Sequence, residues 1–240
     1  MISNPFVPFA PFAFAPYRLS GTVYGVLLNH APALAALGAK ANEAPYKAPP
    51  KAPVLYVKPR NTLAAAGTQT QLPVGVETLQ VGANLGMVIG RTASRVPAQD
   101  WASFVAGYAI VDDLSVSHDS FYRPSVRFKA LDGSCVIGKP VPLERAPNPD
   151  ALAVRVWVDG ALAHRTDTGQ RIRPLAQLLA DVTDFMTLVP GDILLLGTSH
   201  GATNVRAGQR VVIEIDGLGR LEHTLVAAGA PHDHPMEPHA

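Results

Sequence analysis

The chain has 240 residues, enough to bury a substantial core in one large domain or two small ones. Its formal net charge of +1 removes the main electrostatic argument for binding nucleic acid or an anionic membrane. Its single cysteine excludes an internal disulfide and suits a reducing compartment. Its 22 prolines and 20 glycines favour many turns and few long helices.

The N-terminal segment, residues 5–16, is apolar but has neither the pattern of a signal peptide nor that of a membrane span. No basic region precedes it, and prolines interrupt it every few residues. We interpret residues 1–20 as an extended or disordered arm and residues 227–240 as a disordered tail. No other segment approaches a membrane-spanning length, so we expect one cytoplasmic domain over residues 21–226.

Most of the predicted elements are strands. Short apolar or alternating runs bounded by glycine, proline or charge are typical of strands. In chain order these extended segments are 21–29, 54–57, 68–73, 85–90, 104–111, 154–158, 161–166, 193–196, 211–215 and 221–226. Asp159-Gly160 and Asp216-Gly217 are two-residue turn signals, so each predicts a hairpin between the strands that flank it.

Helical signals are fewer. Apolar residues spaced three and four apart predict an amphipathic helix over 172–185, and a start signal with Pro, Gln and Asp predicts another that begins at residue 97. The alanine- and leucine-rich segment 32–40 is weakly helical. Residues 44–53 form a proline-rich loop, and residues 127–133 a loop with clustered charge. The predicted fold class is therefore mostly β with a few helices.

Two carboxylates, Asp112 and Asp113, directly follow the apolar run 104–111. A carboxylate beside a buried strand is costly unless it is solvated, paired or bound to a cation. Adjacent residues on an extended segment point to opposite faces, so Asp112 is not expected to join Asp113 at one site. We therefore place the candidate functional site at the end of this run.

Several short motifs follow one another along the chain. They are Lys58-Pro59-x-Asn61-Thr62, Val88-Ile89-Gly90-Arg91, Gly107-Tyr108, Asp112-Asp113-Leu114-Ser115, Lys129-x-x-Asp132, Thr187-Leu188-x-Pro190-Gly191-Asp192, Gly197-Thr198 and Glu214-Ile215-Asp216-Gly217-Leu218-Gly219. No single motif is specific, but in this order they resemble the fumarylacetoacetate hydrolase family over residues 21–226. The resemblance implies a mixed β-sandwich roll, a divalent Mg or Mn ion, and a dimer.

Two further stretches narrow the resemblance to one branch of the family. They are Ala44-Pro45-Tyr46-Lys47-Ala48-Pro49-Pro50-Lys51 and Ser120-Phe121-Tyr122-Arg123-Pro124. Both are similar to the N-terminal half, or separate first subunit, of the bifunctional isomerase/decarboxylases of homoprotocatechuate (4-hydroxyphenylacetate) degradation. This branch implies decarboxylation of 5-oxopent-3-ene-1,2,5-tricarboxylate and isomerisation of 2-hydroxyhepta-2,4-diene-1,7-dioate.

The resemblance also implies how a metal would be held. In the family, a Glu-x-Glu pair and one Asp supply three carboxylates, the type of ligand that a hard divalent cation prefers. The Asp corresponds to Asp113, whereas Gly82 and Asn84 occupy the two Glu positions. With one carboxylate retained of three, we expect this chain to lack a tight metal site.

The catalytic residues of the family are also altered here. The resemblance places the family's catalytic His and Glu on Ala33 and Ala36. His30 lies nearby and is a candidate substitute base, with a structural or surface histidine as the alternative. Lys58 is retained as a candidate catalytic residue, with a solvated lysine at a strand end as the alternative.

Three further residues are candidates for binding the substrate. The resemblance retains Lys129 and Thr198, and Arg123 is able to bind a carboxylate through two hydrogen bonds. Alternatively, Arg123 pairs with a nearby aspartate. The expected ligand is an oxo-dicarboxylate or oxo-tricarboxylate, a class that basic side chains recognise.

Three functional hypotheses follow. In the first, the chain is a subunit of the isomerase/decarboxylase with a modified active site. In the second, it is a metal-less and catalytically degenerate structural partner of a paralogous, metal-bearing subunit. In the third, it binds a dicarboxylate without turnover. The assembly is a homodimer or a heterodimer with that paralogous subunit, and neither nucleic acid nor a membrane is an expected partner.

Overall fold

The computed structural model describes residues 13–14, 17–18, 21–118, 121–122 and 125–229. Most of the predicted N-terminal arm, most of the predicted tail, and Arg123 lie outside the described residues. Within the part of the chain that is described, no helix is long and apolar enough to cross a membrane.

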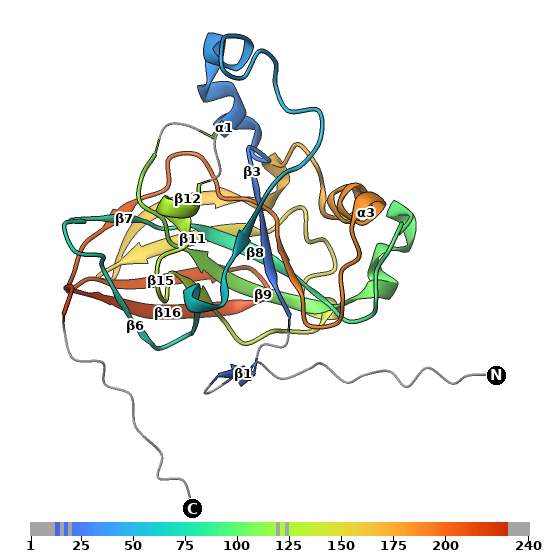
Figure 1. The fold of residues 1–240 in the computed structure, drawn as a ribbon. Coiled ribbons are helices and arrows are strands. Elements are labelled where there is room, and N and C mark those ends of the chain that lie inside the picture. The colour runs from blue at the N-terminus through green and yellow to red at the C-terminus, as the bar shows by residue number, and fades with distance from the viewer. Residues whose placement is uncertain (1–12, 15–16, 19–20, 119–120, 123–124, 230–240) are drawn as a thin grey trace, which may run out of the picture.

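Two β-sheets form most of the fold (Figure 1). The larger sheet has seven strands, in the order β4 (Val54–Lys58), β3 (Val23–Leu27), β13 (Ile193–Leu195), β8 (Ala83–Ile89), β9 (Val105–Asp113), β10 (Cys135–Ile137) and β5 (Leu63–Ala65). The smaller sheet has five, in the order β12 (Ala161–Asp167), β11 (Ala153–Val158), β15 (Arg210–Ile215), β16 (Gly219–Val226) and β6 (Gln69–Gln71). Two-stranded ribbons pair β1 (Ala13–Phe14) with β2 (Tyr17–Arg18), and β7 (Leu79–Gln80) with β14 (Asn204–Val205).

Both sheets are mixed. β13 and β3, β10 and β5, and β16 and β6 pair in parallel, whereas their other neighbours are antiparallel. The hairpin of β11 and β12 turns at Asp159 and Gly160, whose φ values of 50° and 84° are those that the Asp-Gly signal predicts. The predicted fold class, mostly β with a few helices, is therefore confirmed.

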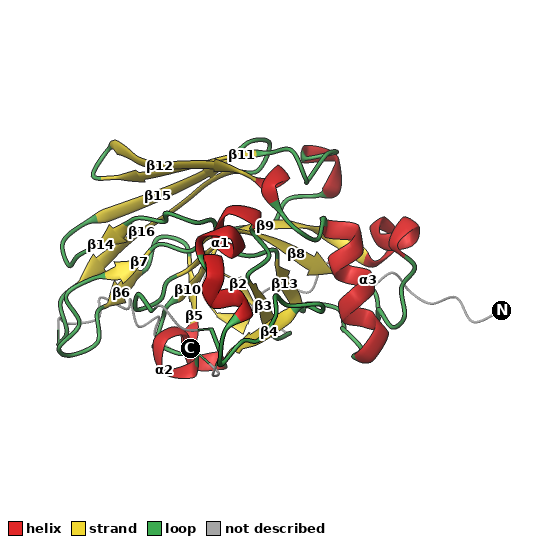
Figure 2. Cartoon of the chain, turned by 90° about the horizontal axis from the view of Figure 1, so that it is seen from above, coloured by secondary structure: helices red, strands yellow, loops and turns green. Residues whose placement is uncertain are grey.

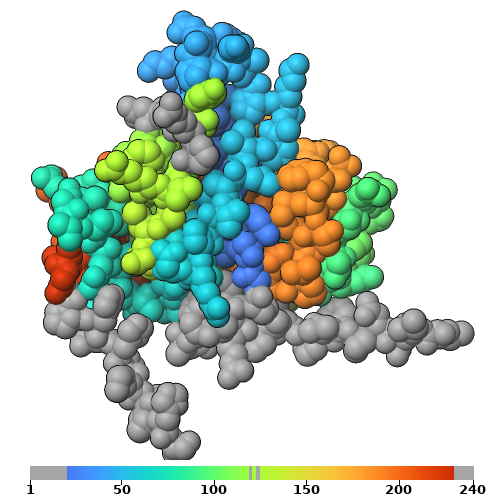
Figure 3. All heavy atoms as spheres, viewed as in Figure 1, coloured from blue at the N-terminus to red at the C-terminus, as the bar shows by residue number. Residues whose placement is uncertain are grey.

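The helices are short except one. α3 (Leu175–Phe185) buries Leu175, Leu178, Leu179 and Val182, as the apolar spacing predicts, but it begins after Pro174 and not at residue 172. α1 (Ala31–Ala36) stands above the sheets in Figure 1 and overlies the middle of the molecule in Figure 2. The segment that continues from it protrudes at the top of the molecule in Figure 3. The helix expected from residue 97 is a 3-10 helix over Ala98–Phe104.

Two predictions about local structure are wrong. Residues 127–133 were expected to be a charged loop, but Val126–Lys129 form the short helix α2. Asp112 and Asp113 were expected just beyond a strand, but they are the last two residues of β9 itself. Pairing with β10 extends β9 through both carboxylates, since Cys135 lies opposite Asp113 and Val136 opposite Asp112.

The central strands are buried on both faces, which explains their continuous apolar runs. On β9, Tyr108 and Ile110 belong to the main core, whereas Ala109 and Val111 belong to a smaller cluster on the other face. The same alternation sends Asp112 toward the smaller sheet and Asp113 to the opposite face. β9 thus places two adjacent carboxylates on opposite faces of the larger sheet.

Candidate functional site

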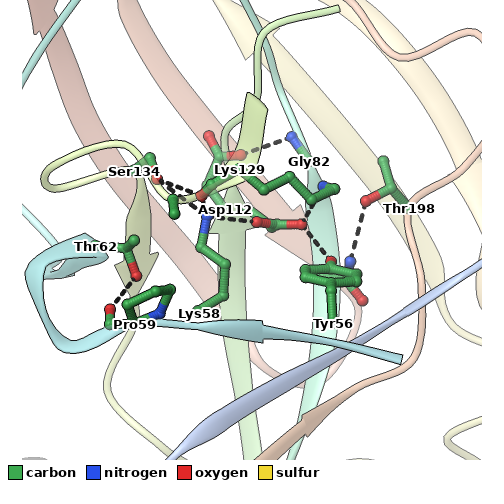
Figure 4. A network of polar contacts seen from close by, with 12 residues as sticks. Tyr56, Lys58, Pro59, Thr62, Gly82, Asp112, Lys129, Ser134 and Thr198 are labelled. Carbon is green, nitrogen blue, oxygen red and sulfur yellow. Dashed lines mark hydrogen bonds and ion pairs between the residues drawn. The ribbon is translucent and has the colours of Figure 1, made fainter. Parts of the chain in front are cut away.

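Asp113 is the centre of a buried polar network. Figure 4 labels its neighbours Tyr56, Lys58 and Lys129. Its Oδ1 lies 2.8 Å from Nζ of Lys58, and its Oδ2 lies 2.6 Å from Nζ of Lys129. The hydroxyl of Tyr56 also donates a hydrogen bond to Oδ2. Tyr56 and Lys58 are two residues apart on β4, so their side chains point to the same side of that strand. Lys129 ends the short helix α2.

The two lysines have different surroundings. Three oxygen atoms surround the Lys58 ammonium: the carbonyl of Lys129, the hydroxyl of Ser134 at 3.0 Å, and Oδ1 of Asp113 in an ion pair. These three oxygens enclose the ammonium and the Lys58 side chain is fully buried, so Lys58 is not accessible to a ligand. Lys129 makes its charged contact with Asp113 and stands 4.7 Å above the ring of Tyr56.

The charges of the network fix its protonation. Burial alone would raise the pKa of the Asp113 carboxyl, but the ammonium groups of Lys129 and Lys58 hold this pKa well below its usual range. Burial, and then the charge of Asp113, raise the pKa of the Tyr56 phenol well above its ordinary value. Tyr56 therefore stays protonated as a donor, and Asp113 stays ionised as the shared acceptor.

Positions 82 and 84, to which the resemblance assigns two metal-binding glutamates, offer no ligand for a divalent cation. A Cβ at Gly82 would lie 2.2 Å from the backbone oxygen of Asp113, so there is no room for a side chain. Oδ1 of Asn84 accepts from the backbone N–H of Gly197 at 2.9 Å, and its Nδ2 donates to Oγ1 of Thr198 at 3.2 Å. Among the residues that the structure describes, no group of three or more His, Cys, Asp or Glu is placed to hold a metal.

Asp112 is held separately on the other face of β9. Its Oδ1 accepts from the backbone N–H of Gly82 at 2.7 Å, and its Oδ2 lies 2.8 Å from Nε2 of His223. Both side chains are fully buried. The sequence analysis missed His223, although Leu221, His223 and Leu225 alternate along β16 and all three are buried. The sequence signal that could have identified it is a histidine at an inward-facing position of a strand whose apolar residues alternate.

A cavity of about 330 Å³ adjoins this network, and we call it the Lys129 cavity. Its polar lining includes Tyr56, Lys129, Lys40, His118, Thr198 and His200. No Asp or Glu is present among the described residues that line it. Ala33 and Ala36 of α1 also line it; these are the positions to which the resemblance assigns the family's catalytic His and Glu.

His30 is not among the described residues that line the cavity. It is buried, and its Nδ1 accepts a hydrogen bond from the backbone N–H of His200 at 3.1 Å. Burial and then the charge of Arg171 lower the pKa of its imidazole, so the ring is neutral with its proton on Nε2. The lone pair that a base would use is therefore engaged with His200. The role of His30 as a base stays a prediction.

One polar pair at the cavity was not foreseen. Ser199, which lines the Lys129 cavity, has its Oγ 2.8 Å from Nε2 of His164 on β12. Burial and then the charge of His200 lower the pKa of His164. The two residues come from distant parts of the sequence and lie in no motif that the analysis recognised.

Comparisons with known proteins identify the family of the chain. The family model "Fumarylacetoacetate (FAA) hydrolase C-terminal" matches residues 22–226. Over 208 residues the chain is 38% identical to the 4-hydroxyphenylacetate degradation bifunctional isomerase/decarboxylase of Escherichia coli. The match covers 87% of this chain and 48% of that protein, so the chain spans about half the length of this relative.

Two solved structures have similar folds. The 5-carboxymethyl-2-hydroxymuconate delta-isomerase from Mycobacterium smegmatis superposes with a TM-score of 0.74 at 28% identity, over 88% of this chain and 80% of that one. The fumarylpyruvate hydrolase from Pseudomonas aeruginosa, solved with Mn2+ and pyruvate, gives a TM-score of 0.73 at 26% identity, over 93% and 99% of the chains. With its family match extending over nearly all of both sheets, the chain belongs to the fumarylacetoacetate hydrolase family.

Proposed function

We propose that the chain is a subunit of the isomerase/decarboxylase of 4-hydroxyphenylacetate degradation. The reactions would be decarboxylation of 5-oxopent-3-ene-1,2,5-tricarboxylate and isomerisation of 2-hydroxyhepta-2,4-diene-1,7-dioate. The relative at 38% identity carries the name of this activity, and a structural neighbour is named an isomerase. The observation that carries the proposal is the Lys129 cavity, where an ammonium group faces a space whose described lining has no carboxylate.

Both reactions pass through an enolate. In the isomerisation, the hydroxyl at C2 loses its proton, the charge spreads along the diene, and a proton is added at C5 to give the 2-oxo-3-ene. In the decarboxylation, loss of CO2 leaves an enolate that takes a proton from solvent. A fixed positive charge beside the developing oxyanion stabilises either intermediate. In this proposal Lys129 supplies that charge, because Lys58 is enclosed by three oxygens.

The test is an assay of the purified chain with 2-hydroxyhepta-2,4-diene-1,7-dioate, followed by the loss of diene absorbance. We expect turnover above the buffer rate, and we expect Lys129→Met to lower kcat/KM at least tenfold. Lys139→Met is the matched control, because Lys139 is exposed and does not line the cavity. A rate equal to that of buffer would refute the proposal for the isolated chain.

A second candidate rests on a different observation. The chain spans about half of its relative, and two of the three metal-binding positions hold Gly82 and Asn84. The chain would then be the metal-less structural partner of a paralogous, metal-bearing subunit in a heterodimer. Co-expression of the two subunits tests this. The partner hypothesis predicts a stable heterodimer whose activity is unchanged by Lys129→Met in this chain, whereas the first proposal predicts a loss.

A further inference from the structure

We infer that the ammonium group of Lys129 stands in for the divalent cation, so that the Asp113 site binds a small carboxylate directly and without metal. This inference takes the ligand class from the proposed function but does not require turnover. Under this inference the site binds an anion, whereas the resemblance implies a site that binds a divalent cation.

The buried charges are the first support. On the cavity side of β9, one carboxylate (Asp113) faces two ammonium groups (Lys58 and Lys129), which leaves one net positive charge. Lys58 is 1% exposed and Lys129 is 6% exposed. Asp112 does not cancel this charge from the same side, because it points to the other face and contacts His223. A buried charge without a partner is costly, so the site favours an anion and repels a further cation.

The donors of Lys129 are the second support. Its ammonium group has three N–H groups and donates one of them to Oδ2 of Asp113 at 2.6 Å. Among the described residues it makes no other hydrogen bond that would occupy the remaining two, and its side chain lines the Lys129 cavity. Two N–H donors of Lys129 therefore have no hydrogen-bond acceptor among the described residues, although the ring of Tyr56 lies against one side of the ammonium.

The third support is the lack of space and of free polar atoms at positions 82 and 84, to which the resemblance assigns metal-binding glutamates. The backbone of Asp113 fills the place of any side chain at position 82, with 2.2 Å to a built Cβ. Both polar atoms of the Asn84 amide already have partners, Gly197 and Thr198. Neither position offers a free ligand atom to a cation, and Lys129 is the charged member of the Asp113 network that lines the cavity.

The lining of the cavity narrows the ligand class. Lys40 also lines the cavity and supplies a second positive charge. A volume of about 330 Å³ is at the lower end of the range typical of small-molecule sites. Two ammonium groups at one small cavity match a short dicarboxylate, with one carboxylate or enolate at Lys129 and the other near Lys40.

Calorimetric titration of EDTA-treated chain with 2-oxoadipate, a short oxo-dicarboxylate, tests the inference. We expect binding without added metal, and the same affinity in millimolar Mg. Lys129→Met should weaken binding at least tenfold, whereas Lys139→Met should leave it unchanged. Lys40→Met should weaken binding of 2-oxoadipate but not that of the monocarboxylate 2-oxobutanoate.

Two results would overturn the inference: binding that appears only with Mg or Mn, and no binding under either condition. If Lys129→Met does not fold, the inference is tested with Lys129→Gln and by comparing the affinity of the unaltered chain for 2-oxoadipate with and without Mg. A failure of the proposed function would give a different result. If the chain binds 2-oxoadipate without metal but does not turn over the diene, the enzyme proposal is rejected and the metal-free anion site is supported.

Discussion

Nζ of Lys58 lies 2.8 Å from Oδ1 of Asp113, and neither side chain is exposed to solvent. Removing one member of a buried ion pair leaves the other charge poorly compensated. We expect Lys58→Met to lower the free energy of unfolding by about 3 kcal/mol, the lower end of the usual range because Lys129 still contacts Asp113. Urea denaturation measures this. The control Lys139→Met should change it by less than about 0.5 kcal/mol, and an equally small effect of Lys58→Met would contradict the structure.

The hydroxyl of Tyr56 gives the second prediction. It donates to Oδ2 of Asp113, while its ring lies beneath the Lys129 ammonium. Tyr56→Phe removes the donor and keeps the ring, so stability should fall by about 1–3 kcal/mol. Thermal unfolding measures the loss. The matched variant Tyr24→Phe should change stability little, because among the described residues the Tyr24 hydroxyl makes no hydrogen bond to this network. Equal stability of the two variants would show that the Tyr56 hydroxyl does not hold Asp113.

The third prediction concerns Gly82. A single methyl group at this position would lie 2.2 Å from the backbone oxygen of Asp113. We expect Gly82→Ala to cost about 1–3 kcal/mol through overpacking, and the double variant Gly82→Glu, Asn84→Glu not to regain a metal site. Gly169→Ala is a milder control, because its nearest atoms are 3.1 Å from a built Cβ. Unchanged stability of Gly82→Ala would show that β8 and β9 can separate to admit a side chain.

The fourth prediction concerns Cys135, the single cysteine of the chain. Its thiol is fully buried, and burial raises its pKa to about 12. The thiolate is the reactive form, so the native protein should be inert to a thiol reagent at pH 8. In denaturant, one thiol per chain should react at once. Rapid labelling of the native protein would mean that the edge of the larger sheet opens readily.

The sequence predicted the strands better than it predicted their partners. The apolar runs on β3, β8 and β13 and the hairpin of β11 and β12 were recognised because burial and turn chemistry are local properties. β10 has only the three residues Cys135–Ile137, too few for a periodic signal, and was missed. That omission moved Asp112 and Asp113 out of β9, since pairing with β10 is what extends β9 through them.

The candidate site was located from the cost of burying a carboxylate, and Asp113 is indeed buried. Its companions depend on strand pairing and cannot be read from spacing. The side chain of Tyr56 reaches Asp113 from β4, a strand at the edge of the same sheet, and His223 reaches Asp112 from the other sheet. Spacing in the sequence also cannot show that Lys58 is enclosed by oxygen atoms while Lys129 lines the cavity, because both depend on the folded surroundings of each nitrogen.

The most direct test of this account is a titration of Mn2+ into the purified chain, followed by electron paramagnetic resonance, with Asp113→Ala measured beside it. The account predicts no site-specific binding at micromolar Mn2+ in either protein, because two lysines already neutralise Asp113 and neither Gly82 nor Asn84 supplies a carboxylate. Micromolar binding to the unaltered chain that disappears in Asp113→Ala would contradict it, and would show that the family's cation is retained.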